Sequence, residues 1–560
     1  MSVHYGRKCQ VWEVQRTTFL VLVYLLPLLT SATDDYYTSL VGLQKLARVE
    51  QQIVSAISEY VTNLERRLQL AKRYLNDYEK SVLPAMSAEE GPSETEQPVT
   101  KLTVYNNEKD LNKLAEKVSS HPLMTYRLIR RYAKELLDFE KDLRKDHDKQ
   151  FSRVMEKIRK GLVLPKVNDV NGAIEGLLRI QDAYDVDIAH FSKGSFNGLR
   201  TNSGLLAIDC YHVGLYSLKS HVYTRAIEWL EQAYLMTTED NDTSIDSQTV
   251  HEALQEAVRQ HNAAIHQTVR NPYVYRAAVN RNLTDRGSRV RVLATKQYKL
   301  YMKDSSMMDF TNFAALCNGT HLRVPSATKD LKCWYETKSP HFLLDPLKVE
   351  MHHRNPPVLQ IYEVLPDWMI SRILAKASPS MVRSKVQGTL ENKEIASAVR
   401  TSTTTWLPES EDKILKRIPQ RVELLTGLKV TEPGSAEDLQ ISSYGIGGHY
   451  NPHFDTLFDT ATMSSVSKEE VLMGDRIATF MFYLSDVERG GGTAFPRLGV
   501  VTSPIKGSAI FWYNMMSDGK PDLLSLHGGC PVLYGNKWVA NKWIRSNAQM
   551  FTRPCSLDRD

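Results

Sequence analysis

Hydrophobic residues recur at helical spacing along the first part of the chain. In residues 34–78 they follow one another at intervals of three, four or seven, as at Leu46, Ile53, Ile57 and Tyr60, with charged side chains between them. This apolar stripe is typical of an amphipathic helix that packs against a partner. The sequence predicts one long helix here. The pattern leaves open whether its partner is another helix of the same chain or a second copy of the chain.

Polar residues 87–98 interrupt this pattern before helical spacing returns. A run of Ser, Glu, Gly and Pro is typical of a loop. We therefore predict that residues 34–165 form an all-α N-terminal domain, and we assign dimerisation to its long helix as a hypothesis.

Residues 166–280 contain tyrosine-rich helical segments that we expect to pair. Gly214, Ala226 and Ala233 fall where a tetratricopeptide-type helix pair places small residues. Aromatic faces suit an extended proline-rich peptide, so we predict a tetratricopeptide-like peptide-binding domain. The alternative is that the aromatic side chains only pack the helices. The candidate peptide-binding residues are Tyr184, Tyr223, Trp229 and Tyr234.

The C-terminal part has short β-rich runs separated by glycine and proline, over residues 350–560. This punctuation is typical of a β-barrel or a jelly roll. Residues 281–349 are expected to be a linker that carries two cysteines. The predicted fold class is a multidomain α+β chain, with an all-α N-terminal domain, a tetratricopeptide-like helical domain and a C-terminal jelly roll.

Charge excludes one class of partner. The chain has 70 Lys and Arg residues against 65 Asp and Glu, a net charge of +5. A nucleic-acid-binding protein usually shows a dense basic stripe, so we expect no nucleic-acid partner.

The N-terminus predicts a secretory route. Basic residues precede eleven apolar residues, Phe19–Leu29, and small residues follow. This run is too short to span a bilayer but suits a signal peptide over residues 1–33, cleaved near Ala32 or Thr33. An uncleaved signal anchor is the alternative. We expect no membrane span in the mature chain. Three glycosylation sequons fit the secretory route: Asn241, Asn282 and Asn318.

Five cysteines remain once the predicted signal peptide is removed. In an oxidising compartment we expect near neighbours to pair and Cys210 to remain a free, buried thiol. Zinc binding is the alternative, but the chain has no C-x-x-C spacing. The expected disulfides are Cys317 with Cys333 and Cys530 with Cys555.

Candidate metal ligands lie in the stretch GIGGHYNPHFDT, which holds His449, His453 and Asp455. Residues two apart in a strand project from the same face, so His453 and Asp455 can reach one ion. His449 has the same parity, but Pro452 interrupts strand pairing between them.

A third ligand is available on a distant segment. His527 lies 72 residues beyond Asp455, in another β-rich run. Two imidazoles and one carboxylate form the facial triad of non-haem Fe(II) oxygenases, which leaves positions open for a co-substrate and dioxygen. Lys537 follows ten residues after His527 and offers a compact cation for the far carboxylate of a dicarboxylic co-substrate.

Several motifs resemble the α subunits of collagen prolyl 4-hydroxylases. They are YGIGGHYNPHFD, RIATFMFYLSDVERGGGTAFP, KGSAIFWYN and HGGCPVLYGNKWVANKW, and the similarity extends more loosely over nearly the whole mature chain. The resemblance implies a double-stranded β-helix (jelly roll) catalytic domain. It implies that His449 is not a ligand. The residues it implies are His453, Asp455 and His527 for Fe(II), Lys537 for the distal carboxylate of 2-oxoglutarate, Tyr444 and Thr493 in support, and Trp543 lining the pocket.

The implied reaction is 4-hydroxylation of peptidyl proline in procollagen, with 2-oxoglutarate and O2 consumed and succinate and CO2 released. The resemblance also implies ascorbate as a reductant, the endoplasmic reticulum lumen as the location, and protein disulfide isomerase as the β subunit of an α2β2 tetramer. The C-terminal SLDRD is not a KDEL-type retention signal, so retention is expected to need a partner.

Two departures from the family pattern leave other functions open. Gly528 and Gly529 stand where relatives often have alanine, and residues 249–280 lack a clear second helical repeat. One alternative is a 2-oxoglutarate hydroxylase that acts on lysine or on a non-collagen proline-rich protein. The other is a noncatalytic subunit that binds peptide or a partner.

Overall fold

In the computed structural model of the chain, the N-terminal amphipathic stripe folds as a hairpin of two helices, α2 (Leu40–Asn63) and α3 (Leu68–Ser87). Gln51 Nε2 donates to the hydroxyl of Tyr78, 27 residues away. In one continuous helix these residues would lie ~40 Å apart. The prediction of a single long helix was therefore wrong. The stripe finds its partner within the chain, since Leu46, Ile53 and Ile57 are fully buried.

The structure describes residues 36, 38–63, 68–87, 108–143, 149–265, 305–337, 339–384, 400–409, 412–457 and 468–556. The predicted signal peptide and Asn282 lie outside these ranges. Residues 35–560 group into one unit by their contacts. No helix in the described ranges is both long enough and apolar enough to cross a membrane.

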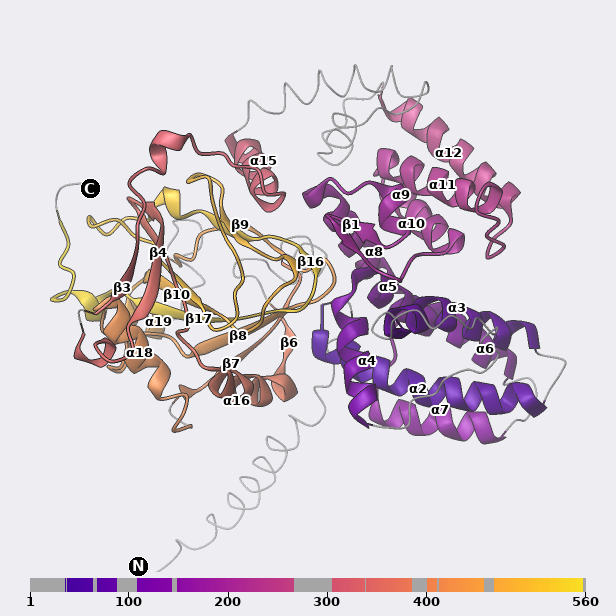
Figure 1. Cartoon of the computed structure of the whole chain (residues 1–560), viewed down its shortest axis with the longest axis horizontal. Helices are drawn as coiled ribbons and strands as arrows, with labels where there is room; N and C mark the ends of the chain where they lie inside the picture. Colours follow the sequence, from indigo (N-terminus) through magenta and orange to yellow (C-terminus); the bar gives the residue numbers. More distant parts are fainter. Residues whose placement is uncertain are drawn as a thin grey trace, which may run out of the picture. The chain divides into compact units, whose positions relative to one another are not determined.

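The other helices of the N-terminal half share one apolar core with the hairpin. This core contains Leu43, Tyr126, Leu177 and Trp229, so it spans both predicted helical domains. The elements, shown in Figure 1, are α4 (Glu108–Ser120), α5 (Pro122–Arg130), the π-helical turn η3 (Arg131–Glu135), α6 (Leu136–Leu143), α7 (Lys149–Gly161), α8 (Val167–Tyr184), α9 (Ile188–Ser192), β1 (Ser195–Phe196), β2 (Leu199–Arg200), α10 (Ala207–Lys219), α11 (Tyr223–Thr238) and α12 (Ser247–Ile265).

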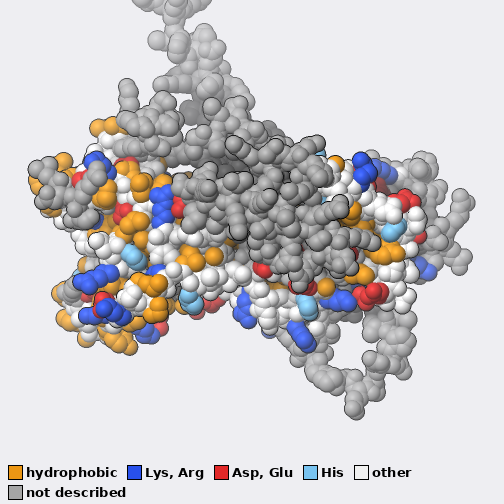
Figure 2. Space-filling view, turned by 90° about the horizontal axis from the view of Figure 1, so that it is seen from above, with side chains coloured by type: hydrophobic (Ala, Val, Ile, Leu, Met, Phe, Trp, Pro, Cys, Tyr) orange, Lys and Arg blue, Asp and Glu red, His pale blue; other side chains and the backbone are white. Residues whose placement is uncertain are grey.

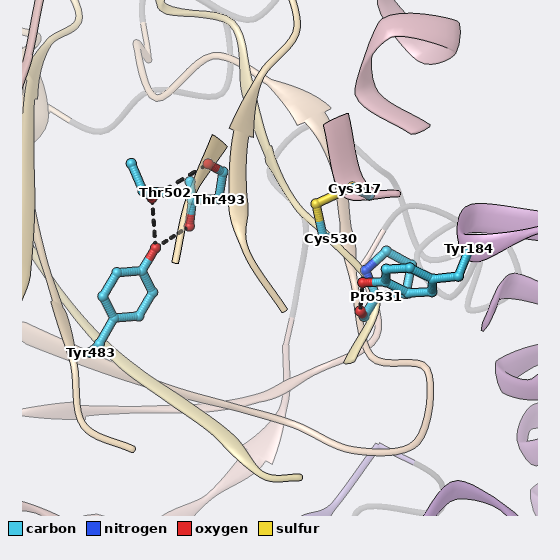
Figure 3. Close-up of a disulfide and its surroundings, with 7 residues drawn as sticks. All are labelled: Tyr184, Cys317, Tyr483, Thr493, Thr502, Cys530 and Pro531. Carbon is cyan, nitrogen blue, oxygen red and sulfur yellow. Dashed lines mark hydrogen bonds between the residues drawn. A yellow bond between two sulfur atoms is a disulfide. The ribbon is translucent and has the colours of Figure 1, made fainter. Parts of the chain in front are cut away.

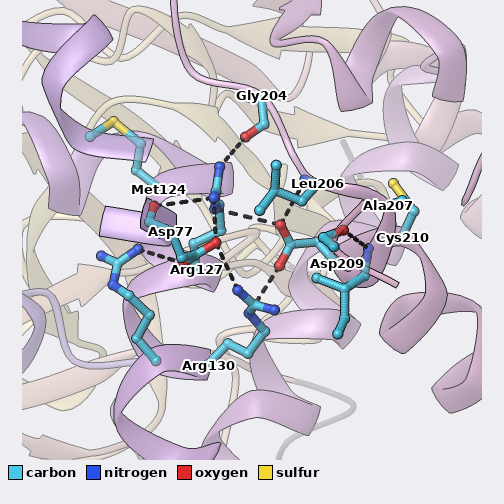
Figure 4. Close-up of polar contacts among 12 residues, drawn as sticks. Asp77, Met124, Arg127, Arg130, Gly204, Leu206, Ala207, Asp209 and Cys210 are labelled. Carbon is cyan, nitrogen blue, oxygen red and sulfur yellow. Dashed lines mark hydrogen bonds and ion pairs between the residues drawn. The ribbon is translucent and has the colours of Figure 1, made fainter. Parts of the chain in front are cut away.

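Buried charges join three of these helices (Figure 4). Arg127 and Arg130 of α5 both pair with Asp77 of α3, and Arg130 Nε lies 2.9 Å from Oδ1 of Asp209 in α10. Burial alone would raise the pKa of Asp77, but the arginines lower it below its usual range. Removal of one partner from such a cluster would leave an uncompensated buried charge, so the cluster fixes how α3, α5 and α10 meet.

Helices α10 and α11 pack closely, as the small residues predicted. A Cβ on Gly214 would lie 2.6 Å from Cγ of Leu230 across the pair, which is closer than van der Waals contact. Helix α12 packs on α11 with Leu254 and Ala257 buried.

The C-terminal half is rich in β-strands, as predicted, and its main sheet is antiparallel. Successive side chains of β10 (Arg476–Tyr483) point to opposite faces of the large sheet. Phe480 and Phe482 enter one core, and Met481 and Tyr483 enter another. The strand order of this sheet is β3 (Cys333–Glu336), β4 (Leu347–Arg354), β5 (Pro357–Ile361), β14 (Ala509–Tyr513), β10, β17 (Lys537–Arg545), β8 (Leu439–Tyr444), β7 (Thr403–Leu407), β6 (Val382–Arg383).

Helices α16 (Asp367–Ala377) and α18 (Arg417–Thr426) contribute to the Phe480 core on one face of the large sheet. Strands β3 and β4 begin in the range expected to be a linker and belong to the large sheet. Together with the second sheet this arrangement is consistent with a jelly roll. The remaining elements are α15 (Ser305–Cys317), η4 (Pro325–Ala327), η5 (Pro340–Phe342), η6 (Ser378–Ser380), β9 (Tyr450–His453), α19 (Lys468–Met473), β11 (Arg489–Gly490), β12 (Thr493–Phe495), β13 (Val500–Thr502), η9 (Leu523–Ser525), β15 (His527–Gly529), β16 (Val532–Tyr534) and η10 (Asn547–Gln549).

The second sheet has the order β13-β12-β15-β9, and β11 pairs separately with β16. On the face seen in Figure 2, basic and acidic side chains of the described residues are interspersed with apolar ones. This mixture matches the near balance of charges in the sequence.

The disulfide pairing differs from the prediction. Cys317 is bonded to Cys530, 213 residues away, and Figure 3 shows the bridge at the end of α15. Cys333 and Cys555 are exposed and free, so both predicted pairs were wrong, whereas Cys210 is a buried free thiol as expected. The reason is tertiary packing. Helix α15 lays its apolar face on the second sheet beside Cys530, whereas Cys333 lies on the edge strand β3.

Candidate metal centre and co-substrate pocket

The second sheet brings the three predicted ligands together. Strands β9 and β15 are antiparallel neighbours, with His453 directly opposite His527. Asp455 follows β9. Its Oδ1 lies 3.7 Å from Nε2 of His453, and its Oδ2 lies 3.7 Å from Nε2 of His527. One ligand atom of each of the three residues lies within 4.8 Å of the others. This geometry fits one metal ion bound on a single face.

The orientation of both imidazoles suits metal binding through Nε2. Nδ1 of His453 lies 2.7 Å from the carbonyl oxygen of Asn451, and Nδ1 of His527 lies 2.9 Å from that of Ser525. A carbonyl accepts only, so each Nδ1 carries the proton and each Nε2 keeps its lone pair for a metal. The residues present therefore fit an Fe(II) ion.

The ligand carboxylate is charged and held in place. Burial alone would raise the pKa of Asp455, but the positive charge of Arg476 and the hydrogen bond from Thr479 contribute to lowering it. Burial lowers the pKa of His453 to about 3, so its imidazole is neutral. A charged carboxylate and a neutral imidazole are the forms that bind a divalent cation.

His449 lies outside the triad. Its Nδ1 is 2.8 Å from the hydroxyl of Thr401, and its backbone N–H donates to the same hydroxyl. It supports the turn before β9, in agreement with its exclusion from the ligand set.

Lys537 is a buried cation at the start of β17. It stands opposite Tyr444 of β8 in the sheet, with Nζ 5.2 Å from the centre of the tyrosine ring. Burial lowers the pKa of its ammonium to about 7. Among the described residues no carboxylate pairs with this ammonium. A carboxylate bound beside this ammonium would complete the pair.

Thr493 of β12 lies opposite Gly529 of the strand that carries His527. The hydroxyl of Tyr483 lies 2.8 Å from that of Thr493 and 2.9 Å from that of Thr502 (Figure 3). Tyr483 lies inside the motif RIATFMFYLSDVERGGGTAFP but was not predicted as a site residue, because its contact with Thr493 depends on how the strands pack.

Known proteins resemble this chain over nearly its full length. A family model described as Prolyl 4-Hydroxylase alpha-subunit, N-terminal region, matches residues 39–198, and one described as 2OG-Fe(II) oxygenase superfamily matches residues 439–545. The chain is 30% identical to prolyl 4-hydroxylase subunit alpha-1 of Gallus gallus, over 93% of this chain and 99% of that protein. The chain belongs to the prolyl 4-hydroxylase α-subunit family.

Other members of the prolyl 4-hydroxylase α-subunit family have similar identity. Subunit alpha-1 of Rattus norvegicus is 29% identical over 98% of this chain and 99% of its own length. The corresponding values for subunit alpha-1 of Caenorhabditis elegans are 29%, 94% and 91%. The oxygenase match contains the whole triad and Lys537, so Fe(II) and 2-oxoglutarate are the cofactors of the chain.

Trp543 adjoins two residues, Thr479 and Arg476, that hydrogen-bond to Asp455. It pairs with Thr479 across β17 and β10, and the guanidinium of Arg476 stacks 3.7 Å from its ring centre. Arg476 also pairs with Glu437 through Nε at 2.6 Å. Trp543 was predicted only through the resemblance, and Arg476 was not predicted, because its place in the site depends on strand register.

Close packing around β15 leaves no room for a side chain at Gly528. A Cβ there would lie 2.8 Å from Cε2 of Phe313 in α15 and 2.9 Å from the carbonyl oxygen of Tyr450. The alanine that the resemblance led us to expect would therefore crowd α15 against β15.

The candidate peptide-binding residues fall into two groups. Tyr184 and Trp229 are buried; Trp229 donates from Nε1 to Gln181, and Tyr184 donates to the carbonyl oxygen of Pro531. Tyr223 and Tyr234 are half-buried on the α10–α12 helices. Only the second pair retains accessible aromatic surface.

Proposed function

We propose that the chain hydroxylates peptidyl proline at C4 in collagen-like, proline-rich substrates. The supporting observation is that the buried Lys537 ammonium lies beside β15, the strand that carries His527, because a Cβ on Gly529 of that strand would lie 3.6 Å from Lys537 Nζ. A metal site with a buried cation beside it suits a co-substrate that has two carboxylates. The overall reaction converts peptidyl proline, 2-oxoglutarate and O2 into 4-hydroxyproline, succinate and CO2. One oxygen atom enters each organic product.

The residues of the chain have distinct parts in this reaction. Nε2 of the two histidines and the carboxylate of Asp455 would hold Fe(II), which activates O2 for C–H hydroxylation when it is bound. Lys537 binds and orients the distal carboxylate of 2-oxoglutarate. Thr493 and Tyr444 support that carboxylate, and Trp543 lines the pocket. Their burial excludes water, which strengthens the ion pair with Lys537.

We further propose that α10, α11 and α12 form a tetratricopeptide-like substrate-binding domain, within residues 166–280. Tyr223 and Tyr234 are the candidate contacts for peptide, since aromatic faces pack against polyproline II helices. Tyr184 and Trp229 act by holding the helices that carry them. Residues 266–280 lie outside the described residues.

The proposed setting is the endoplasmic reticulum lumen, with protein disulfide isomerase as the β subunit of an α2β2 tetramer and with ascorbate as reductant. Self-association through the N-terminal helices is part of this proposal. Asn241 and Asn318 are exposed, which suits glycosylation. The free thiols of Cys333 and Cys555 are exposed to a disulfide-exchanging partner.

Co-expression with protein disulfide isomerase, followed by incubation with Fe(II), 2-oxoglutarate, ascorbate and Pro-Pro-Gly repeats, tests the proposal. We expect succinate and a one-oxygen gain per modified proline, and neither from His453→Ala. Succinate without peptide oxidation would indicate a lysine-containing or non-collagen proline-rich substrate. Neither product from folded wild-type protein would indicate a noncatalytic subunit.

A further inference from the structure

Helix α8 contacts the turn that connects a co-substrate residue to a metal ligand. The segment 445–449 joins Tyr444 of β8 to β9, which ends at His453. Arg179 of α8 donates from Nε to the carbonyl oxygen of Gly447 at 3.2 Å. A Cβ on Gly176 would lie 2.7 Å from the carbonyl oxygen of Ile446, so the backbones of α8 and this turn are in direct contact.

The same helix contacts the second connection of the site. The segment 530–536 joins β15, which begins at His527, to Lys537 of β17. Tyr184, the last residue of α8, donates from its hydroxyl to the carbonyl oxygen of Pro531 at 2.5 Å (Figure 3). The backbone N–H of Gly491 donates to the same carbonyl at 3.1 Å. Tyr184 is only 4% exposed, so water does not replace this bond easily.

The two connections are also bonded to each other. The backbone N–H of Val532 donates to the carbonyl oxygen of Gly448 at 3.0 Å. Ile446 and Leu533, one from each connection, are buried in the apolar core of the helical region. A displacement of either segment therefore affects the other and exposes apolar surface.

The opposite side of α8 is anchored to the helix pair α10–α11. Trp229 donates from Nε1 to Oε1 of Gln181 at 3.0 Å, and Arg225 forms a buried ion pair with Asp182. Tyr216 donates to Oε1 of Glu175 at 2.5 Å. Because both of its sides are held, α8 provides a fixed surface against which the two connections pack.

We infer that α8 sets the geometry of the co-substrate pocket, with Tyr184 and Gly176 as positioning residues that act through the segments 530–536 and 445–449. The inference rests on the proposed function, in which Lys537 receives 2-oxoglutarate. Each connection joins a ligand of the triad to a residue of the co-substrate pocket. A change in either connection therefore alters the distance between the metal centre and Lys537 or Tyr444.

The first test removes one hydroxyl. Tyr184→Phe keeps the ring in the core but loses the bond to Pro531. The control is Tyr132→Phe, because the fully buried Tyr132 donates its hydroxyl to the carbonyl of Leu46 at 3.1 Å, within the helical region. We expect Tyr184→Phe to raise the dissociation constant of 2-oxoglutarate about fivefold, as expected for one lost hydrogen bond. The control should leave it unchanged.

The binding of 2-oxoglutarate is measured by calorimetry on the full chain, co-expressed with protein disulfide isomerase. The protein is loaded with Mn(II), so that no turnover is needed. Amide hydrogen exchange is measured over residues 530–536 in parallel. Faster exchange of this segment is expected in Tyr184→Phe and not in Tyr132→Phe. Steady-state assays should show the change mainly in the KM for 2-oxoglutarate.

The second test adds one methyl group. Gly176→Ala places a Cβ against the carbonyl of Ile446, whereas a Cβ on the control residue Gly161 meets no atom within 4 Å. Both glycines are helical, so alanine is otherwise favourable at each position. We expect Gly176→Ala to weaken 2-oxoglutarate binding about fivefold or more, through overpacking, and to speed exchange over residues 445–449. Gly161→Ala should do neither.

Unchanged 2-oxoglutarate affinity in folded Tyr184→Phe and Gly176→Ala would overturn the inference, even if exchange of the connections increased. An equal loss of affinity in a variant and in its control would assign the effect to general destabilisation and would overturn it as well. If Tyr184→Phe does not fold, the Gly176 pair decides. Failure of the wild-type protein to bind 2-oxoglutarate would instead reject the proposed function, and the exchange data would still report whether α8 holds the two segments.

Discussion

The hydroxyl of Thr479 donates a hydrogen bond of 2.6 Å to Oδ2 of Asp455. Asn514 donates from Nδ2 to the same hydroxyl at 2.9 Å, so the threonine hydroxyl accepts one hydrogen bond and its proton is directed to the carboxylate. Thr479 and Asn514 lie on the large sheet or directly after one of its strands, whereas the metal ligands lie on or next to the second sheet. The two sheets thus cooperate to orient one ligand.

Thr479→Val should weaken metal binding by about 10–100-fold, the usual effect of losing a hydrogen bond to a ligand. The shape of the side chain is nearly unchanged, so the fold should be kept. Titration with Mn(II) measures the dissociation constant. Thr405→Val, which removes a hydroxyl from β7 that pairs with Ser380 at 3.0 Å, is the control and should bind metal normally. Equal affinity in all three proteins would show that Asp455 needs no support.

Lys537→Ala should raise the KM for 2-oxoglutarate by about a hundredfold or more, since loss of one partner of a buried ion pair costs roughly 3–5 kcal/mol. Metal affinity should change little, because Lys537 is not a ligand. The matched control is Lys506→Ala. In the wild type the ammonium of Lys506 pairs with Asp367 at 2.9 Å on the surface. An unchanged KM in Lys537→Ala would remove this residue from the co-substrate pocket.

The disulfide can be mapped directly. Digestion under non-reducing conditions should release a peptide that links Cys317 to Cys530, while Cys333 and Cys555 react with an alkylating reagent in the native protein. Cys210 should react only after unfolding, because it is buried. Cys317→Ser should lower stability by about 2–5 kcal/mol, seen as a lower thermal midpoint. Peptides that link Cys317 to Cys333, or Cys530 to Cys555, would contradict the structure.

Acid should destabilise the helical region through His121. Its Nδ1 accepts from the backbone N–H of Leu123 at the start of α5, and burial lowers the pKa of the imidazole to about 3. The unfolded chain, with a pKa near 6.5, binds a proton that the folded chain does not bind. Stability contributed at this site is therefore fully present above pH 6.5 and falls by ~1.4 kcal/mol per pH unit between pH 6.5 and 3.

His121→Asn keeps an acceptor at the helix start and removes the titration. Thermal midpoints of both proteins at pH 5 and pH 7.5 test the prediction. The wild type should lose more stability than the variant on acidification, since all other histidines are shared. Parallel losses would show that His121 titrates normally in the folded chain.

The metal centre could be predicted largely from the sequence because its signals are local. His453 and Asp455 are two residues apart on one extended segment, so covalent geometry alone places them on the same side. His527 and Lys537 were found through motif spacing. The supporting residues Thr479, Tyr483 and Arg476 lie inside a family motif, but the motif did not indicate their roles, since their side chains reach the site only through the register of β10 with its neighbours.

In the helical region, too, local features could be predicted from the sequence and long-range contacts could not. The stripe of Leu46, Ile53 and Ile57 predicted an amphipathic helix, but it did not predict the reversal between α2 and α3. Similarly, the tyrosine-rich pattern predicted paired helices, while the burial of Tyr184 and Trp229 followed from packing against other elements.

The sequence by itself determined the periodicity of each element and the ligand types, because these depend on neighbours along the chain. Only the tertiary structure decided the helical hairpin, the bond between Cys317 and Cys530 and the contact of α8 with both connections of the pocket. These features join residues that are far apart in sequence, and their positions follow from which apolar faces pack together. Near-neighbour reasoning about cysteines failed for this reason.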